Sequence, residues 1–491
     1  MKRAAGTLMH ITSLPSNFGI GTMGKEAYHF ANFLKNSSQS YWQILPIGPT
    51  GFGDSPYQSF SMYAINPYLI DLDMLCEDSL LKKEDYYSLD WGINKFSIDY
   101  GKIYDTRFNV LKIAFENFKS KNQDKFNIFI NENIWLSDYA LYMAVKQHFG
   151  MISFTQWPDS DIRRRTEDSI KKYSFMLSKE IKFWMFLQFL AFNQWNKLKK
   201  YVNSLGLKII GDIPIYVGLD SVETWVNPEL FMLDENHMPT CVAGCPPDSF
   251  SDKGQLWGNP IYNWERLKKD NYKWWIKRFG AALNLFDIIR IDHFRGFDSY
   301  YSIPYPAENA KKGKWQDGPG LEFFNILKKE LGDLPIIAED LGFLTPCVKK
   351  MLLDTKYPGM KILQFAFDSS KSSDFLPHNY NKNCVAYTGT HDNSTIVGWA
   401  KSAKENEVAY AFEYGAFSKE EGTNWGMIRL LYSSVADLAV VPLQDYLGLD
   451  DESRMNIPST LGGNWKWRVD KNSLTDDLAN KIKKMVKCYG R

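Results

Sequence analysis

The sequence predicts an α/β fold, a (β/α)8 TIM-type barrel, from two observations. Eight short runs bounded by Gly, Pro or Asp are nearly continuous in apolar character, which is typical of parallel strands buried on both faces. Amphipathic helical stretches such as 27–34 and 321–331 lie between several of these runs, and eight alternating units favour a closed barrel. The expected strands are TLMHITSL (7–14), YWQILPI (41–47), LKIIGDI (207–213), FDIIRID (286–292), LPIIAEDL (334–341), MKILQFAF (360–367), CVAYTGT (384–390) and LAVVPLQD (438–445).

The chain is longer than a barrel requires, so we expect large, mainly helical insertions after the second and third strands. It has 491 residues, whereas a typical barrel needs about 250. Aromatic-rich helical periodicity predicts a helical insertion subdomain over 53–205. The second insertion, 214–280, is expected to supply an active-site loop, and 243–260 within it is rich in Gly, Pro and Asp and therefore predicted to be irregular. Residues 1–491 form one catalytic domain on this interpretation.

A C-terminal helix is expected to pack on the barrel over 470–491. Ser473 and Asp476 have the spacing of a capping box, which marks the start of a helix. An apolar stripe then follows at helical spacing, which predicts a face buried against the barrel. The stripe comprises Leu474, Leu478, Ile482, Met485 and Val486.

Composition excludes several classes of function. The formal net charge is +1, so the chain lacks the electrostatic field that draws a protein to nucleic acid or to an anionic membrane. Hydrophobic residues at 44% and charged residues at 23% indicate a chain that folds throughout. Aromatic residues reach 15%, more than one core needs, and this excess favours a flat ligand such as a sugar ring.

Compartment and metal content are predicted from the same survey. The six cysteines are scattered, as expected of unpaired thiols in a reducing compartment, and Cys241 and Cys245 have no second ligand pair that would complete a zinc site. The apolar start of the chain is interrupted by His10 and Thr12, which argues against a signal peptide. The most apolar window, 183–192, is shorter than the roughly 20 residues of a membrane span. We therefore expect a cytoplasmic protein.

The motif Gly19-Ile-Gly21-Thr-Met-Gly24 matches the dinucleotide fingerprint G-x-G-x-x-G, but its context does not. The glycines begin five residues after the expected strand, with Pro15 in between. No Asp or Glu lies about 20 residues further on to hold a ribose. Nucleotide binding is therefore disfavoured.

Acidic residues gather at the carboxyl ends of the expected strands, where barrel enzymes build their active sites: Asp212, Asp292, Glu339 and Asp392. The two-residue period of a strand places Arg290 and Asp292 on one inward face, and a guanidinium keeps a carboxylate ionised, as a nucleophile requires. Glu339 ends a very apolar strand, where desolvation would raise its pKa and suit it to general acid catalysis. Two such carboxyls are the equipment of glycoside cleavage.

Each of these residues also has a plainer interpretation. A single Asp at the end of a strand often belongs to a buried ion pair or caps a helix. His293 and His391 stand beside two of the aspartates and could be metal ligands, although metal ligation calls for a tighter cluster. We interpret both as donors to sugar hydroxyls and expect no metal.

Four ordered motifs make the sequence resemble the 4-α-glucanotransferase family, also called amylomaltase or disproportionating enzyme, of the α-amylase superfamily. The motifs are GDIPIYV (211–217), RIDHFRG (290–296), AEDLG (338–342) and YTGTHDN (387–393). The resemblance runs end to end, from HITSLPSNFGIG (10–21) through GPTGFGDSPYQSFS (48–61) to NIPSTLGGNWKWR (456–468). It implies that Asp292 is the nucleophile, Glu339 the general acid/base and Asp392 the transition-state stabiliser. Arg290, His391 and Asp212 would then be their immediate support.

The resemblance also implies a set of sugar-binding residues. Tyr57 would stack under the sugar whose bond is broken, with Asp54 or Ser55 nearby. Asp248 and Trp257 would line the acceptor side. Asn464 would reach in from GNWKWR. The chain departs from the family at Ser459, where the usual residue is Gly, and this concerns fine substrate preference.

The reaction implied is a retaining double displacement that transfers an α-1,4-glucan segment to the 4-hydroxyl of another glucan or of glucose. It needs no cofactor. The partners expected are maltooligosaccharides and glucose, with starch or glycogen as further candidates, and no nucleic acid, membrane or obligatory protein. Two alternatives stay open at this point: an α-1,4-glucan hydrolase with the same carboxylates, and a catalytically silent glucan-binding protein.

Overall fold

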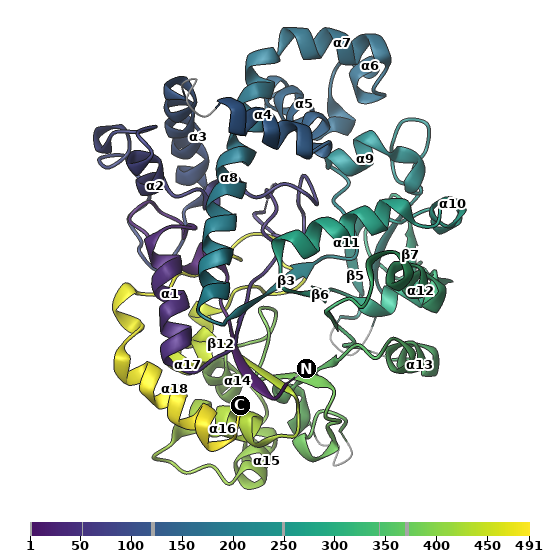
Figure 1. Ribbon diagram of the computed structural model, residues 1–491. Coiled ribbons are helices and arrows are strands. Elements are labelled where there is room, and N and C mark those ends of the chain that lie inside the picture. Colours follow the sequence, from purple (N-terminus) through teal and green to yellow (C-terminus); the bar gives the residue numbers. More distant parts are fainter. Residues whose placement is uncertain (1, 52, 119–122, 248–250, 343, 369–372) are drawn as a thin grey trace.

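Eight parallel strands form one sheet in the described part of the chain, which comprises residues 2–51, 53–118, 123–247, 251–342, 344–368 and 373–491 of this computed structural model. The strands are neighbours in the order β10-β11-β12-β1-β2-β3-β6-β9. The N–H of Ala338 in β9 donates to the carbonyl of Pro358, just before β10, at 2.9 Å and joins the two ends of the sheet. The predicted barrel is confirmed, with its strands at the centre of Figure 1. The strands are β1 (Ala4–Leu8), β2 (Tyr41–Gln43), β3 (Lys208–Ile213), β6 (Ile288–Ile291), β9 (Ile336–Ala338), β10 (Gly359–Ile362), β11 (Cys384–Tyr387) and β12 (Leu438–Pro442).

The first strand lies further toward the N-terminus than its apolar pattern predicts. β1 covers Ala4–Leu8, and the remainder of the expected strand contains a 3-10 helix at Ile11–Ser13. β1 consists largely of small residues because the backbone of β2 lies close to it. A Cβ on Gly6 would lie 2.9 Å from the carbonyl oxygen of Tyr41 in β2. Alanine and glycine are weak strand formers, so the local sequence does not predict a strand here. The strand forms because of its packing against neighbouring strands.

Helices fill the chain between β2 and β3, within the range where a helical insertion is expected. They rise above the barrel in Figure 1, and α8 returns from them to β3. Aromatic side chains recur on the buried face of α8: Phe183, Trp184, Phe186, Phe189 and Trp195. The helices are α2 (Leu72–Glu77), α3 (Tyr100–Asn117), α4 (Gln123–Glu132), α5 (Trp135–His148), α6 (Ser160–Arg163), α7 (Glu167–Met176) and α8 (Ser178–Ser204).

The prediction of an irregular segment over 243–260 is wrong at both of its ends, because 243–245 belong to one strand and 255–260 to another, while 248–250 lie outside the described residues. β4 (Cys241–Cys245) pairs with β5 (Gln255–Pro260) on one side and with β7 (Ser299–Pro304) on the other, and β8 (Lys314–Asp317) completes an antiparallel sheet. Glycine permits this pairing, since a Cβ on Gly244 would lie 2.1 Å from the carbonyl oxygen of Gln255. The central partner, β7, lies beyond the fourth barrel strand, so local composition could not reveal it.

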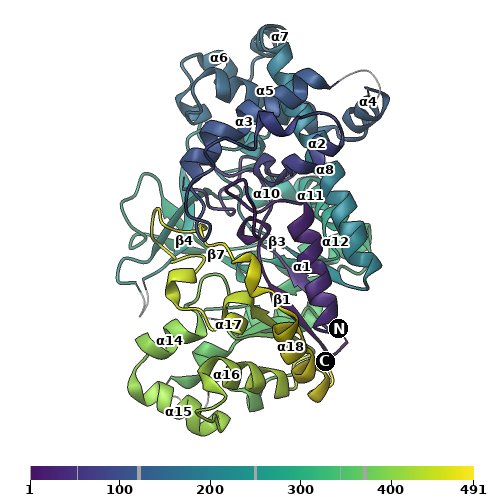
Figure 2. The ribbon, with the colours of Figure 1, turned by 90° about the vertical axis from the view of Figure 1, so that its left-hand side faces the viewer.

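Most of the remaining helices lie around the barrel, whereas α9 packs against α5. The C-terminal helix α18 packs beside α1, as both views show (Figure 2). Its N-cap is Thr475, whose hydroxyl accepts the N–H of Leu478 at 3.2 Å, so the predicted capping box at Ser473 and Asp476 is wrong by two residues. No described helix is long and apolar enough to cross a membrane. These helices are α1 (Lys25–Asn36), α9 (Val222–Val226), α10 (Trp264–Lys269), α11 (Lys273–Leu285), α12 (Gly320–Leu331), α13 (Pro346–Thr355), α14 (Ile396–Ser402), α15 (Glu405–Gly415), α16 (Gly422–Ser433), α17 (Leu443–Leu447) and α18 (Asp476–Cys488).

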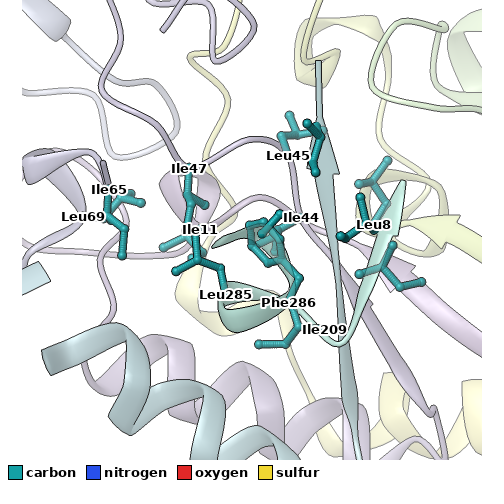
Figure 3. Packing of buried hydrophobic residues seen from close by; sticks show 14 of the residues in the cluster. Leu8, Ile11, Ile44, Leu45, Ile47, Ile65, Leu69, Ile209, Leu285 and Phe286 are labelled. Carbon is teal, nitrogen blue, oxygen red and sulfur yellow. The ribbon is translucent and has the colours of Figure 1, made fainter. Parts of the chain in front are cut away.

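The hydrophobic core supports the polar end of the barrel. Leu8, Ile44, Ile209 and Phe286 pack together in Figure 3, and all are buried. Gly211 makes room for Phe286, because a Cβ there would lie 2.1 Å from the ring. One residue further along β3 the chain switches to a carboxylate, so the polar groups at the strand ends rest on a close-packed apolar base.

Candidate active site

The predicted acidic residues lie at the carboxyl end of the barrel, and one guanidinium joins two of them. Asp212 in β3 and Arg290 in β6 are register partners. Arg290 Nη1 donates to Asp212 Oδ2 at 2.6 Å and to Asp292 Oδ1 at 3.1 Å, with Arg290 and Asp212 almost fully buried. Asp292 therefore has the positive charge of Arg290 beside it, and Arg290 has the buried carboxylate of Asp212 as a second counter-ion.

The protonation of Asp292 depends on its burial and on several charged neighbours. Burial raises the pKa of Asp292 to about 6, and the nearby carboxylates Asp212 and Asp392 add to the rise, whereas Arg290 and His391 oppose it. Arg290 lowers the pKa of Asp292, as expected of a neighbouring guanidinium, but the cost of removing the carboxylate from water exceeds this attraction. The group is still mainly ionised at pH 7.

Glu339 follows β9 and is the more readily protonated of the two carboxyls. Burial raises the pKa of Glu339 to about 7, as its apolar strand predicts, and the neighbouring Asp292 raises it further against the attraction of Arg290. Two backbone N–H groups hold its oxygens, that of His293 at 2.6 Å and that of Leu341 at 3.0 Å. The carboxyl is therefore poised to donate a proton near neutral pH and is held in one orientation.

Asp392 lies in the loop after β11, and its pKa is lowered, whereas those of Asp292 and Glu339 are raised. Although burial alone would raise it, the His391 ring and the Asn456 amide lower the pKa of Asp392 to about 2. His391 Nε2 lies 3.3 Å from Asp392 Oδ2, and Asn456 Nδ2 donates to Asp392 Oδ1 at 2.6 Å. The neighbouring carboxylate likewise raises the pKa of His391 despite its burial. Asp392 is therefore ionised throughout the physiological range.

Tyr57 connects the two groups of carboxylates. Its hydroxyl donates to Asp212 Oδ2 at 2.9 Å. Its ring stacks on that of His391, with centroids 5.2 Å apart and planes 17° apart, and tilts toward Trp465 at 5.9 Å. This stack gives the site an aromatic wall, in keeping with the predicted role of Tyr57 beneath a sugar ring.

The other predicted binding residues are brought to the rim to different degrees. Trp257 packs edge-to-face against His293, whose burial lowers its pKa to about 3 and keeps the ring neutral. Burial raises the pKa of Asp54 to about 6, partly offset by Lys466. Ser55 shapes the turn before the aromatic wall, because its hydroxyl accepts the N–H of Tyr57 at 3.3 Å. Asp248 lies outside the described residues.

Asn464 makes hydrogen bonds within its own loop, and its contact with a bound sugar stays a prediction. Its side chain accepts the N–H of Ile457 at 3.0 Å and donates to the Thr460 hydroxyl at 3.0 Å. These contacts connect parts of the loop that contains Asn464, and none of them is to Asp292, Glu339 or Asp392. In the same loop Ser459 has φ of +64°, the left-handed region that favours glycine, which accounts for the usual Gly of the family at this position.

Sequence reasoning missed Asn456, whose side-chain amide donates to the Asp392 carboxylate. It lies inside the NIPST stretch, yet no strand end or charge marks it. Its role becomes visible only when the chain returns to the barrel after β12. Neither His293 nor His391 belongs to a cluster of metal-ligating side chains among the described residues.

Comparison with known proteins identifies the family of the chain. Residues 9–474 match the family model described as 4-alpha-glucanotransferase. The 4-alpha-glucanotransferase of Clostridium butyricum is 50% identical over 486 residues, covering 98% of this chain and 100% of the relative. That of Thermus thermophilus is 44% identical over 503 residues, covering 100% and 99%.

Solved structures point the same way. The amylomaltase of Streptococcus agalactiae in complex with acarbose superposes with a TM-score of 0.99 at 44% identity over 100% of both chains. The amylomaltase of Corynebacterium glutamicum, at 20% identity and a TM-score of 0.80 over 98% of this chain and 75% of its own, shares the fold. The resemblance inferred from the motifs is confirmed: the chain belongs to the 4-alpha-glucanotransferase family, whose activity is the transfer of glucan segments.

Proposed function

We propose that Asp292, Glu339 and Asp392 perform this transfer by a retaining double displacement. The observation that carries the proposal is the pair of carboxyls with different surroundings: Asp292 on the guanidinium of Arg290, and Glu339 held by two backbone N–H groups. Asp292 attacks the anomeric carbon of an α-1,4-glucan while Glu339 donates a proton to the departing 4-oxygen. A covalent glucosyl-enzyme forms and the shortened chain leaves.

The second half-reaction reverses the first with a new partner. Glu339, now ionised, removes the proton from the 4-hydroxyl of an acceptor glucan or glucose. That oxygen attacks the anomeric carbon, the bond to Asp292 breaks, and the configuration is retained. Asp392 stabilises the transition state through the sugar hydroxyls, and its low pKa supports this role because it stays ionised while Glu339 gains and loses its proton.

Substrate choice follows from the aromatic wall and from the relatives. Tyr57 and Trp257 offer flat surfaces on which glucose units stack. The Streptococcus agalactiae amylomaltase was solved with acarbose. We infer that maltooligosaccharides are donors, that glucose and maltooligosaccharides are acceptors, and that starch or glycogen supplies longer chains. The scattered placement of the six cysteines supports action in the cytoplasm.

The test is incubation with maltotriose alone. Transfer gives glucose and a ladder of longer maltooligosaccharides with no net gain of reducing ends. A rise in reducing ends with nothing longer than maltotriose would show hydrolysis instead and overturn the transfer step.

The covalent step has its own test. Glu339→Gln incubated with α-maltosyl fluoride should gain one maltosyl group, because fluoride leaves without a proton whereas release to an acceptor needs the lost base. Peptide mass mapping should locate the group on Asp292. Labelling of another residue would refute the assignment of the nucleophile.

A further inference from the structure

A C-terminal segment, residues 450–465, lies against the loop that carries Asp392. The carboxylate of Asp451 accepts the N–H of Thr395 at 2.9 Å. Further along, Trp465 donates its N–H to the carbonyl of Met455 at 2.6 Å and folds the segment back on itself. The segment is therefore anchored at both ends beside the active site.

Asn456 is held from both sides within this segment. Its N–H donates to the carbonyl of His391 at 3.0 Å, and its own carbonyl accepts Arg454 Nε at 2.8 Å. Arg454 also donates to the carbonyl of Asp392 and, at 3.2 Å, to the hydroxyl of Ser394. From this backbone position, Asn456 Nδ2 donates to Asp392 Oδ1 at 2.6 Å.

We propose that Asn456 is a positioning residue for the transfer reaction, whose amide holds the Asp392 carboxylate in the orientation that meets the sugar hydroxyls. This inference rests on the proposed role of Asp392. A carboxylate on a loop can rotate about two side-chain bonds, and 43% of the Asp392 side chain is exposed, so packing alone does not fix it. A charge-assisted hydrogen bond supplies both direction and strength.

Charged and titratable groups face Asp392 from several elements. His391 approaches from its own loop, Arg290 and Asp292 from the end of β6, and Tyr57 from the loop after β2. Asn456 does not titrate, and it donates a hydrogen bond to Asp392 Oδ1. We expect Asn456 to orient the Asp392 carboxylate rather than to change its charge. Substitutions that remove or replace the amide N–H while keeping the fold test this role.

The first test compares Asn456→Ala with Thr460→Val. Loss of a hydrogen bond to a charged group predicts a fall in kcat of about 10- to 100-fold for Asn456→Ala. The KM for maltotriose should stay within about threefold, because uniform binding is unchanged. Thr460→Val, which loses hydroxyl contacts to Ile457 and Asn464 in the same loop, should keep kcat within about twofold.

The second test restores the donor with a proton. In Asn456→Asp two carboxyls would adjoin, and one of them would hold a proton at acidic pH that replaces the lost amide N–H. The ratio of Asn456→Asp to wild-type kcat/KM should therefore fall as pH rises from 5 to 8. The same ratio for Asn456→Ala should stay constant. Melting temperatures and circular dichroism of each variant establish that it is folded.

The outcomes separate this inference from the proposed function. Wild-type kcat in Asn456→Ala, equal losses in Asn456→Ala and Thr460→Val, or flat ratios for both Asn456 variants would overturn the inference. Asp392→Asn serves as the reference, and it should lose far more activity than any Asn456 variant. If Asp392→Asn stays active, the role of Asp392 fails instead.

Discussion

The two sides of the active site hold their carboxylates by different means. On the β6 and β9 side the sheet continues beyond the strands: Asp292 N–H donates to the carbonyl of Ile213, and Glu339 N–H to that of Ile291, both at 3.0 Å. On the β11 side Asp392 stands five residues past the strand and depends on the C-terminal segment. Strand-borne groups are thus positioned by neighbouring strands, whereas the loop-borne group is positioned by a remote stretch of chain.

The same contrast governs protonation. Burial raises the pKa of both Asp292 and Glu339, because the barrel end removes them from water. Asp392 is more exposed and has two polar neighbours, which lower its pKa. Glu339, on the β9 side, therefore gains and loses a proton near neutral pH, whereas Asp392, on the β11 side, stays negatively charged.

The largest expected effect is on the strand-borne pair. Asp292→Asn and Glu339→Gln should each lower kcat for maltotriose disproportionation by about 10⁴-fold, since each removes one member of a set that acts together. Melting temperatures should stay within a few degrees of wild type at pH 7. Near-normal turnover in either variant, or loss of folding without loss of specific activity, would mean that the pair is structural.

A pair of arginine variants compares the two sides directly. Arg290→Met leaves Asp212 and Asp292 buried without their shared partner, so it should lower the free energy of unfolding by roughly 3 kcal/mol and kcat by at least about 100-fold. Arg454→Met loses contacts to main-chain oxygens in a half-buried place and should cost about 1 kcal/mol. Chemical denaturation measures both, and equal losses would erase the distinction between the sides.

Neutralising Glu339 and neutralising Asp392 should change the melting temperature at pH 8 in opposite directions. The folded pKa of Glu339, about 7, exceeds its ordinary value of 4.5, so its contribution to stability is lost as pH rises through that interval. Glu339→Gln should therefore melt a few degrees above wild type at pH 8, with the gain absent at pH 4. Asp392 has the opposite shift and is stabilising above pH 4. Asp392→Asn should melt below wild type at pH 8, and calorimetry at the two pH values checks both signs.

The smallest effect on activity is expected for Tyr57, which contacts Asp212 on one side of the site and His391 on the other. Tyr57→Phe loses the hydrogen bond to Asp212 and keeps the stack on His391, so kcat/KM should fall by about 10-fold or less. Tyr57→Leu, the matched variant without the ring, should cost several times more through KM. If the two variants are equal, the aromatic wall does not bind the sugar.

Sequence reasoning succeeded where local pattern and tertiary position coincide. Asp292 and Glu339 end apolar strands, and parallel strands bring their carboxyl ends to one edge, so their meeting could be predicted. Asn456 could not be identified, because its partner Asp392 is fixed by the way the chain returns to the barrel. The sheet of β4 and β5 was missed for a related reason, as its central partner β7 comes from another part of the chain.

The place of β12 in the barrel has a consequence for biosynthesis. β12 (Leu438–Pro442) is the last barrel strand to be translated, yet it pairs with β1 (Ala4–Leu8), the first. At about 5–20 residues per second, the ribosome needs roughly 20–90 s to supply the missing neighbour. During that interval the apolar edge of β1 has no partner on that side. The barrel can therefore close only when the polypeptide is nearly complete.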